Sequence, residues 1–526
     1  MRWVDAPPRV GGPLTYRRVM HHRRFVAVTL TVALGLSLSV SAPGVAPAWA
    51  AQSASPSNPA LQDYYAQRIT WQPCEGRGPR VQCAQVSVPL DYSQPQGRTI
   101  DLALLRVPAS SATAGSLVVN PGGPGASGLD FAEYLGSVID PDVRGAYDIV
   151  GFDPRGVGDS APVECLTGKQ TTRWYRTDPT PDTAAERATF MSRAAAISRG
   201  CVARDRELAR FVGTENTVRD MDVIRAALGE SDLNWLGFSY GTLLGALYAQ
   251  EFPDTVGRMV LDGAVDPDLD AMGISLDQSN GFQQAVERFA ADCARRSGCV
   301  AQSKEGVLAA INSLLRSLDR SPMRTDGSRR LVQAEALTAL FFSMYSTDLW
   351  PTLRTGLRQA AGGDGTTLQL LAQLANDQIG PNRYGSNIAS AFYAIGCWDY
   401  PAPPGEAGLR AAAGEWARGA VVPQMAQAMS WGNAPCSSWF DHSVQAPTAV
   451  TSDTTAPMLI IGTTFDPATP YAWSQSLARQ LPTSRLLTYR GDGHTAYGNT
   501  NMCIDDITDR YLLTGMLPAP GTTCSN

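Results

Sequence analysis

The sequence of 526 residues predicts an α/β fold in which a mostly parallel central sheet is interrupted by a large, mainly helical insertion. Apolar segments of strand length alternate with helical segments in the first and last parts of the chain. Between these parts lies a long stretch that shows helical periodicity alone. The composition, with 44% hydrophobic and 17% charged residues, supplies enough apolar side chains for a folded core.

The first part of the chain contains the alternation that predicts the sheet. Its early strands end in turn residues, and two of them are apolar on both faces, which is typical of strands buried between helical layers. The expected elements, in chain order, are strands 81–90, 99–107, 115–120 and 147–152, helix 216–228, strand 234–237, helix 241–251 and strand 259–263.

The periodicity changes at about residue 268, and no convincing buried strand follows until strand–helix alternation returns near the C-terminus. We therefore expect an α/β core formed by residues 61–267 and 447–526, a helical cap insertion at 268–446 and a flexible tail at 51–60. The helices expected in the cap are 282–296, 306–318, 334–345 and 368–376. The elements expected after it are strands 457–462 and 484–490 and helices 471–480 and 504–517.

Residues 1–50 have the pattern of a secretory signal peptide. Basic residues precede an apolar run at 25–40, and an Ala-Trp-Ala sequence that ends at Ala50 provides a cleavage site. The run is shorter than the ~20 residues that a membrane-spanning helix needs. We expect a secreted or cell-wall associated protein with no stable membrane insertion after cleavage. The start codon (Met1 or Met20) and the export route stay open.

The charge of the chain argues against nucleic acid as a partner. Six arginines lie in residues 1–50, so the remaining chain is more acidic than the net charge of −6 suggests. An acidic surface repels a phosphate backbone. The sequence gives no indication of the oligomeric state.

All ten cysteines lie after the cleavage site, and an even number in an exported chain predicts disulfides. Many pairings are open, and the simplest hypothesis joins neighbours along the chain. There is no Cys-x-x-Cys motif, and the histidines are too few and too scattered for a zinc site, so we expect no metal and no cofactor. The neighbouring pairs are Cys74–Cys83, Cys165–Cys201, Cys293–Cys299, Cys397–Cys436 and Cys503–Cys524.

The segment Gly237–Gly241 has the pattern Gly-x-Ser-x-Gly and lies between an expected strand and an expected helix. Such a strained strand-to-helix turn is the nucleophile elbow of the α/β-hydrolase fold, and it would expose the hydroxyl of Ser239. A chance match to this short pattern is the alternative, and the strand and helix around it favour the elbow. We therefore predict an α/β-hydrolase fold with Ser239 as the nucleophile.

A serine needs a base to accept its proton, and only His442 and His494 remain after cleavage. His494 follows a late expected strand, where this fold delivers its base, whereas His442 ends the insertion and is expected to be structural or to line the pocket. Because a histidine base must be neutral, activity should fall below about pH 6–7.

The third member of the triad must orient the histidine. Asp466 follows the strand 457–462 and completes the order Ser, Asp, His along the chain. Asp262 and Asp492 are the alternatives, and Asp492 is the weaker one because it lies too near His494 in sequence to reach back to its ring.

The segment Asn120–Gly128, rich in glycine and proline, follows an early buried strand. In this fold the corresponding loop supplies backbone N–H groups to the oxyanion. We expect these donors to be Gly123, or its neighbour Gly122, together with Tyr240. A plain turn is the alternative, and a phosphate loop is disfavoured because the Lys-Ser/Thr ending is absent.

These segments together resemble the secreted tripeptidyl aminopeptidases of actinobacteria, which belong to the proline-iminopeptidase-like α/β-hydrolases. The resemblance rests on Asn120–Gly125, Phe152–Gly158, Gly237–Thr242 and Phe252–Gly263 and on the surroundings of Asp466 and His494, and it runs from about residue 86 to the C-terminus.

The resemblance implies a serine exopeptidase that releases short peptides, often tripeptides, from free N-termini through an acyl-enzyme. It implies that the insertion is a cap and that acidic residues bind the substrate's ammonium group. Asp399, in a segment similar to the family's cap motif, is the candidate for that role, and a purely structural acid is the alternative. Asp153 and Arg155 are expected to brace the loop beneath the site. Carboxylesterases are also relatives, and a non-catalytic cell-wall or binding protein is the alternative from another class.

Overall fold

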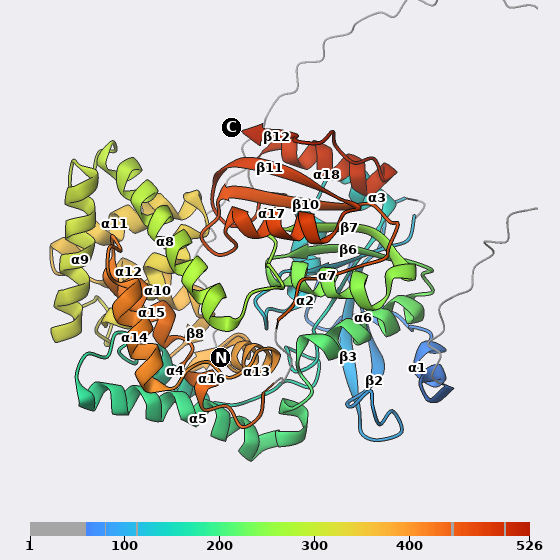
Figure 1. Ribbon diagram of the computed structural model, residues 1–526, viewed down its shortest axis with the longest axis horizontal. Helices are drawn as coiled ribbons and strands as arrows, with labels where there is room; N and C mark the ends of the chain where they lie inside the picture. Colours follow the sequence, from blue (N-terminus) through green and yellow to red (C-terminus); the bar gives the residue numbers. More distant parts are fainter. Residues whose placement is uncertain (1–58, 79, 112–113, 443–446, 499–500, 526) are drawn as a thin grey trace, which may run out of the picture. The chain divides into compact units, whose positions relative to one another are not determined.

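The computed structural model describes residues 59–526 except 79, 112–113, 443–446, 499–500 and 526 (Figure 1). These residues belong to the unit Ala51–Asn526. The expected signal peptide and the first eight residues of the expected tail lie outside the described residues. The last two tail residues, Pro59 and Ala60, begin the 3-10 helix η1 (Pro59–Leu61), which the short helix α1 (Gln62–Tyr65) follows.

The centre of the fold is a ten-stranded sheet with the order β1-β2-β3-β5-β4-β6-β7-β10-β11-β12 (Figure 1). The pairs β1–β2, β2–β3 and β3–β5 are antiparallel, and the other neighbours are parallel. The strands are β1 (Gln72–Pro73), β2 (Gln82–Pro89), β3 (Thr99–Val107), β4 (Ser116–Asn120), β5 (Asp148–Phe152), β6 (Leu233–Phe238), β7 (Val256–Asp262), β10 (Met458–Phe465), β11 (Ser484–Asp492) and β12 (Thr523–Ser525).

Side chains that alternate along each central strand fill two separate cores. On β4, Val118 packs into one core, while Leu117 and Val119 pack into the other. The Val118 core includes α6 (Thr214–Leu228), α7 (Tyr240–Glu251) and α17 (Tyr471–Gln480). The opposite core includes α2 (Gly128–Val138), α3 (Pro141–Ala146) and α18 (Met502–Thr514). Because helices cover both faces, the strands are apolar on both sides, as the sequence predicts.

The segment between β7 and β10 is mainly helical. Its first helices, α8 to α12, share a third apolar core with the start of α15, whereas α13, α14 and α16 pack into the core of α6 and α7. The two-stranded ribbon β8–β9 is an exception to the helical pattern. The elements are α8 (Ala271–Ala294), α9 (Lys304–Arg320), α10 (Gln333–Met344), η3 (Thr347–Leu349), α11 (Trp350–Ala361), α12 (Thr366–Ala375), β8 (Gln378–Gly380), β9 (Arg383–Tyr384), α13 (Ile388–Asp399), α14 (Glu406–Trp416), α15 (Pro423–Trp431) and α16 (Ala434–Ser437).

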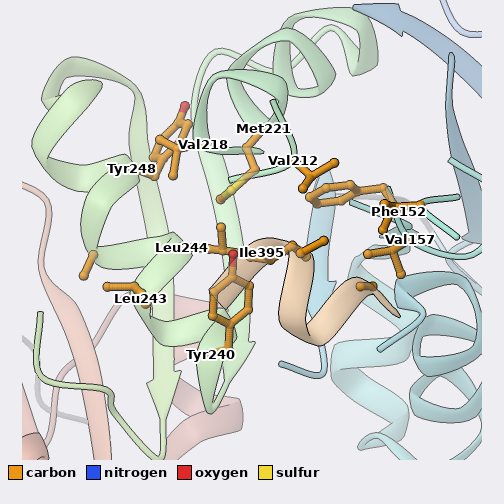
Figure 2. Packing of buried hydrophobic residues seen from close by; sticks show 14 of the residues in the cluster. Phe152, Val157, Val212, Val218, Met221, Tyr240, Leu243, Leu244, Tyr248 and Ile395 are labelled. Carbon is orange, nitrogen blue, oxygen red and sulfur yellow. The ribbon is translucent and has the colours of Figure 1, made fainter. Parts of the chain in front are cut away.

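Two earlier helices, α4 (Gly168–Tyr175) and α5 (Ala184–Ala209), also take part in this helical region. Helix α5 contacts both α13 and α16. Figure 2 shows Ile395 of α13 beside Tyr240 and Leu244 of α7, within one apolar cluster. The helical layer next to α7 is therefore assembled from two separate stretches of the chain, and the domain boundaries expected from the sequence remain a prediction.

The ten cysteines form five disulfides between neighbours along the chain. Two of these bridges tie the layer just described together. Cys165–Cys201 joins the loop before α4 to α5, and Cys397–Cys436 joins α13 to α16. Among the residues that the structure describes, none of the helices combines the length and hydropathy that crossing a membrane requires.

Candidate active site

Ser239 lies in the turn between β6 and α7, and its backbone is strained. Its φ of 54° and ψ of −122° fall in a region that non-glycine residues rarely adopt. The Ser239 N–H donates to the carbonyl of Asp262 on the neighbouring strand, 2.9 Å away, and this bond fixes the turn. The hydroxyl is thereby presented at the N-terminus of a buried helix, which is the geometry of a nucleophile elbow.

His494 and Asp466 are directly hydrogen-bonded. The His494 Nδ1 lies 2.9 Å from Asp466 Oδ1 and 3.0 Å from Oδ2, and the Asp466 side chain is fully buried. The carboxylate also accepts backbone N–H groups from Ala468, Thr469 and Thr495, and the hydroxyl of Thr469. Asp466 is therefore held rigidly and in turn fixes the orientation of the imidazole.

The pKa of His494 is raised above its ordinary value. Burial by itself lowers this pKa, but the charge and hydrogen bond of Asp466 and the charge of Asp262 raise it further than burial lowers it. A base with a raised pKa accepts the serine proton more readily, and it is blocked by protonation at a higher pH than an unperturbed histidine.

Asp262 connects the turn at Ser239 with the loop that follows His494. Its carboxylate accepts the N–H groups of Ala496 and Tyr497, 2.9 and 2.8 Å away, while its carbonyl accepts the N–H of Ser239. Burial raises the pKa of Asp262 to about 7, although these N–H groups and His494 lower it. Asp262 thus holds the loop after His494 and does not replace Asp466 at the imidazole.

The His494 ring lies against the backbone beside the nucleophile turn. A Cβ added to Gly263, the residue after Asp262, would lie 3.4 Å from His494 Cε1. The described part of the chain contains no hydrogen bond between the Ser239 hydroxyl and this ring. Such bonds are commonly long in a free enzyme and shorten when substrate binds.

The loop after β4 lies directly against the nucleophile turn. A Cβ on Gly122, whose φ is +94°, would lie 2.6 Å from the carbonyl oxygen of Phe238 and 3.1 Å from the Tyr240 nitrogen, so only glycine fits. The Gly122 N–H donates to the side chain of Asn120. Among the described residues, the N–H groups of Gly123 and Tyr240 have no hydrogen-bond partner, so these two donors are available to an oxyanion.

Asp399 caps the N-terminus of α6. Its Oδ1 accepts the N–H of Thr214 at 2.7 Å, and its Oδ2 accepts the Thr214 hydroxyl, which also contacts the hydroxyl of Tyr240. The cap residue of α6 is Gly213, where a Cβ would lie 2.2 Å from the Trp398 ring. Because this position has no side chain to accept the first N–H groups of the helix, Asp399 supplies the cap from elsewhere in the chain. Asp399 therefore has a structural role.

Asp399 also lines the cavity that contains Ser239. This cavity of about 300 Å³ is bounded by Gly123, Ser239, Tyr240, Thr469 and Asp399 among others. Burial raises the pKa of Asp399 to about 7, although its hydrogen bonds to Thr214 lower it. A carboxyl group with unused lone pairs thus faces the same cavity as Ser239.

The other sequence candidates lie in different surroundings. His442 Nδ1 lies 3.1 Å from the carbonyl oxygen of Cys397, beside a disulfide. Asp492 is paired with Arg288 of α8, with Nη2 2.8 Å from Oδ2. Neither residue contacts the pair of Asp466 and His494 through a hydrogen bond within the described residues.

Asp153 and Arg155 lie beneath the site. Asp153 accepts the hydroxyl of Ser127 and the N–H of Asp159, and Arg155 forms a fully buried ion pair with Asp220. Asp153 therefore braces the loop that continues from the oxyanion donors, and Arg155 ties its own loop to α6.

The structure adds positioning contacts that sequence reasoning missed. The His494 N–H donates to the carbonyl of Tyr345 at 2.8 Å, and the two rings meet edge to face with centroids 5.1 Å apart. Thr469 Oγ1 lies 3.3 Å from His494 Nδ1. Thr469 follows Asp466 by three residues and could have been suspected, but the contact with Tyr345 spans 149 residues and left no local signal.

Comparisons with known proteins agree with this architecture. A family model described as TAP-like protein matches residues 422–524, which include Asp466 and His494. The serine protease Hip1 of Mycobacterium tuberculosis is 36% identical over 477 residues, covering 87% of this chain and 91% of that protein. Carboxylesterase B of the same species is 35% identical over 459 residues (84% and 86%). The tripeptidyl aminopeptidase of Streptomyces lividans is 35% identical over 480 residues (87% and 86%).

The fold and these relatives together define the class of the protein: it is a serine peptidase with the α/β-hydrolase fold. Within that class the chain belongs to the family that contains the tripeptidyl aminopeptidases and the serine protease Hip1. The resemblance noted from the sequence motifs is therefore confirmed.

Proposed function

We propose that the protein releases tripeptides from substrates with a free N-terminus, and that Ser239, His494 and Asp466 perform the reaction. The observation that carries this proposal is the cavity of about 300 Å³ in which Ser239 and Asp399 face the same space. This volume lies at the lower end of the range for ligand pockets and suits a short peptide.

In the proposed reaction, the Ser239 hydroxyl attacks the scissile carbonyl and gives its proton to Nε2 of His494. The backbone N–H groups of Gly123 and Tyr240 bind the oxyanion that forms. His494 then transfers its proton to the leaving nitrogen, the C–N bond breaks, and the peptide stays on Ser239 as an ester. Water repeats the sequence with His494 as base, and the free peptide leaves. Asp466 accepts the Nδ1–H of His494 throughout.

Asp399 is proposed to bind the α-ammonium group of the substrate. Thr214 holds the carboxyl in place, and the burial that raises the pKa of Asp399 also strengthens an ionic hydrogen bond to an ammonium group. The distance between Ser239 and Asp399 would then determine how many residues fit between the scissile bond and the amine, which makes the enzyme an exopeptidase.

The protein is further proposed to act outside the cytoplasm. Five disulfides are stable in an oxidising compartment, and the segment 1–50 has the composition of a cleavable export signal.

The test compares three substrates with the same tripeptide sequence: a free-amine anilide, its N-acetylated form and a simple ester of the N-acetylated tripeptide. A tripeptidyl aminopeptidase hydrolyses the free anilide and loses most activity on acetylation. A carboxylesterase, the second candidate because Carboxylesterase B is a relative, hydrolyses the ester and is indifferent to acetylation. A non-catalytic protein hydrolyses none of them and is not labelled by a fluorophosphonate probe. The esterase pattern and the absence of activity would each contradict the proposal.

A further inference from the structure

A second, smaller cavity adjoins the candidate active site. Its volume is about 150 Å³, and it is lined by Pro121, Phe238 and His494 together with apolar side chains of α2. Pro121 precedes the oxyanion loop and Phe238 precedes the nucleophile, so the cavity meets the site at the residues that surround the scissile bond. The proposed mechanism assigns no role to it.

The outer wall of this cavity consists of apolar side chains that remain accessible to solvent. Tyr134 and Val138 of α2 are 55% and 50% exposed. Phe131, one turn earlier, packs edge to face against Phe238 with ring centroids 5.4 Å apart and lies 6.5 Å from the Tyr134 ring. The α2 wall is therefore fixed to the residue beside the nucleophile, and exposed apolar groups gathered at a cavity indicate a binding site.

The position of the cavity relative to the reacting groups suggests its occupant. The larger cavity contains Ser239 and Asp399, whereas His494 lines the smaller one. A substrate whose amine lies at Asp399 must continue past His494, because His494 has to protonate the nitrogen of the leaving residue. The side chain of that residue is then next to Pro121 and Phe238.

A third cavity, of about 440 Å³, also reaches His494 but suits this role less well. It is lined by charged residues such as Arg288, Asp348 and Asp492, and neither Pro121 nor Phe238 belongs to its lining. It therefore lies away from the oxyanion loop and from the residue before the nucleophile.

We propose that the cavity of about 150 Å³ binds the side chain of the residue directly after the scissile bond, and that it selects a large apolar or aromatic side chain. This inference rests on the proposed function. Among the described residues that line the cavity, none is acidic or basic except His494, so an ionised side chain would lose its hydration there without a partner. A glycine would leave the apolar wall unused.

The same pocket must also bind an acceptor amine in the reverse of acylation. There the amine nitrogen attacks the acyl carbonyl, the bond from that carbon to Ser239 Oγ breaks, and His494 takes a proton from the amine and returns one to Oγ. An acceptor with an aromatic side chain should then compete with water better than glycinamide does.

The first experiment uses tetrapeptide amides Ala-Ala-Ala-X, where X is Phe, Leu, Gly or Asp. We expect kcat/KM for Phe and Leu to be at least about 10-fold higher than for Gly, with Asp lowest. The variants Tyr134→Ala and Val138→Ala should lower kcat/KM for Phe about 5-fold or more and leave Gly within about 2-fold. The matched control is Leu374→Ala, an apolar residue of α12 with 59% exposure, which should change neither value.

The second experiment measures how the acyl-enzyme formed from a tripeptide ester partitions between water and an added amine. Phenylalaninamide should capture the acyl group more effectively than glycinamide, and Tyr134→Ala should remove that advantage, whereas Leu374→Ala should keep it. Equal cleavage of the Phe and Gly substrates, or a variant that lowers both by the same factor, would overturn the pocket assignment. If no tetrapeptide is cleaved although the ester is, the proposed function fails, and the partition experiment still decides on the pocket.

Discussion

The sheet core and the helical layer contribute different kinds of group to the cavity around Ser239. The core places Ser239, Asp466 and His494 after the ends of β6, β10 and β11, and short backbone hydrogen bonds hold each of them. The helical layer contributes Asp399, at the end of α13, which the core holds through Thr214. The difference suggests that bond cleavage depends on the core, whereas recognition of the substrate's amine depends on the layer above it.

The largest expected effect tests the contribution of the sheet core to bond cleavage. Ser239→Ala removes the nucleophile, so kcat/KM should fall at least about 10³-fold for the free-amine anilide and for the ester alike. The measurement is the hydrolysis rate of both substrates, with thermal unfolding as the control for an intact fold. Hydrolysis of either substrate at more than a few per cent of the wild-type rate would contradict the role of Ser239.

Asp466→Asn should lower kcat by about 10⁴-fold for both substrates, because an amide no longer favours the tautomer of His494 that accepts the serine proton. The matched control is Asp492→Asn, which changes an acid two residues from His494 that pairs with Arg288 instead. A loss of similar size in both variants would indicate that loop structure, and not the orientation of the imidazole, accounts for the effect.

Asp399→Asn tests the contribution of the helical layer. It keeps an oxygen that can accept the Thr214 N–H but removes the charge, so kcat/KM for a free-amine tripeptide should fall about 10- to 100-fold. Hydrolysis of the N-acetylated peptide or of the ester should stay within about 2-fold. An equal loss on all three substrates would assign Asp399 a purely structural role.

The pH dependence should separate the two regions. His494 must be neutral and its pKa is raised, so every substrate loses activity as the pH falls, with the acid limb above 6.5. Asp399 must be ionised to bind an ammonium group. Because its pKa is about 7, protonation of Asp399 also lowers activity on free-amine substrates, so their acid limb reports two protonations. Log kcat/KM should therefore fall more steeply, by one proton, for the free-amine peptide than for the ester.

Asp399→Asn should remove that difference in slope. Asp262, which faces His494 and has a pKa of about 7, contributes equally to both substrates and does not affect the comparison. The free-amine substrate should also lose activity above about pH 8, because its α-amino group deprotonates near 7.7–8.0. Parallel acid limbs in the wild-type enzyme would contradict an ionic role for Asp399.

The smallest expected effect concerns a contact between the two regions. Arg288 of α8 pairs with Asp492 at the end of β11 and lies 3.6 Å above the centroid of the Phe465 ring. The pair is partly exposed, so Arg288→Met should cost about 1–2 kcal/mol of stability and lower kcat/KM a few-fold for all substrates. Arg295→Met, near the end of the same helix, is the control. Stability is measured by thermal unfolding, and an equal loss of stability in both variants would contradict a role for the contact.

The candidate site residues could be placed in the fold from the sequence because their signals are local. The Gly-x-Ser-x-Gly turn lies between a strand and a helix, and His494 and Asp466 each follow a strand, so the order along the chain indicates the candidate site. The strands β3 and β4 and the helix α17 appear within one residue of their expected bounds for the same reason, since their apolar patterns are short and end in turn residues.

The helical layer could not be predicted to the same depth. Helix α5 is rich in alanine and charged residues and has no single clear apolar face, so its sequence shows no usable periodicity. The same holds in the sheet for the edge strand β12, which has only three residues. The contacts of Asp399 with Thr214 and of Tyr345 with His494 join residues far apart in the chain. Such contacts depend on how α13 and α10 pack, which a single sequence does not encode in any short pattern.

The most direct test of the central claim is the mass of the acyl-enzyme. The enzyme is mixed with a free-amine tripeptide ester, quenched in acid within the first turnover, digested and analysed by mass spectrometry. The account predicts an increase equal to the tripeptide acyl group on the peptide that contains Ser239, and no such increase in Ser239→Ala. Turnover of the ester without acylation, or acylation at another residue, would contradict it.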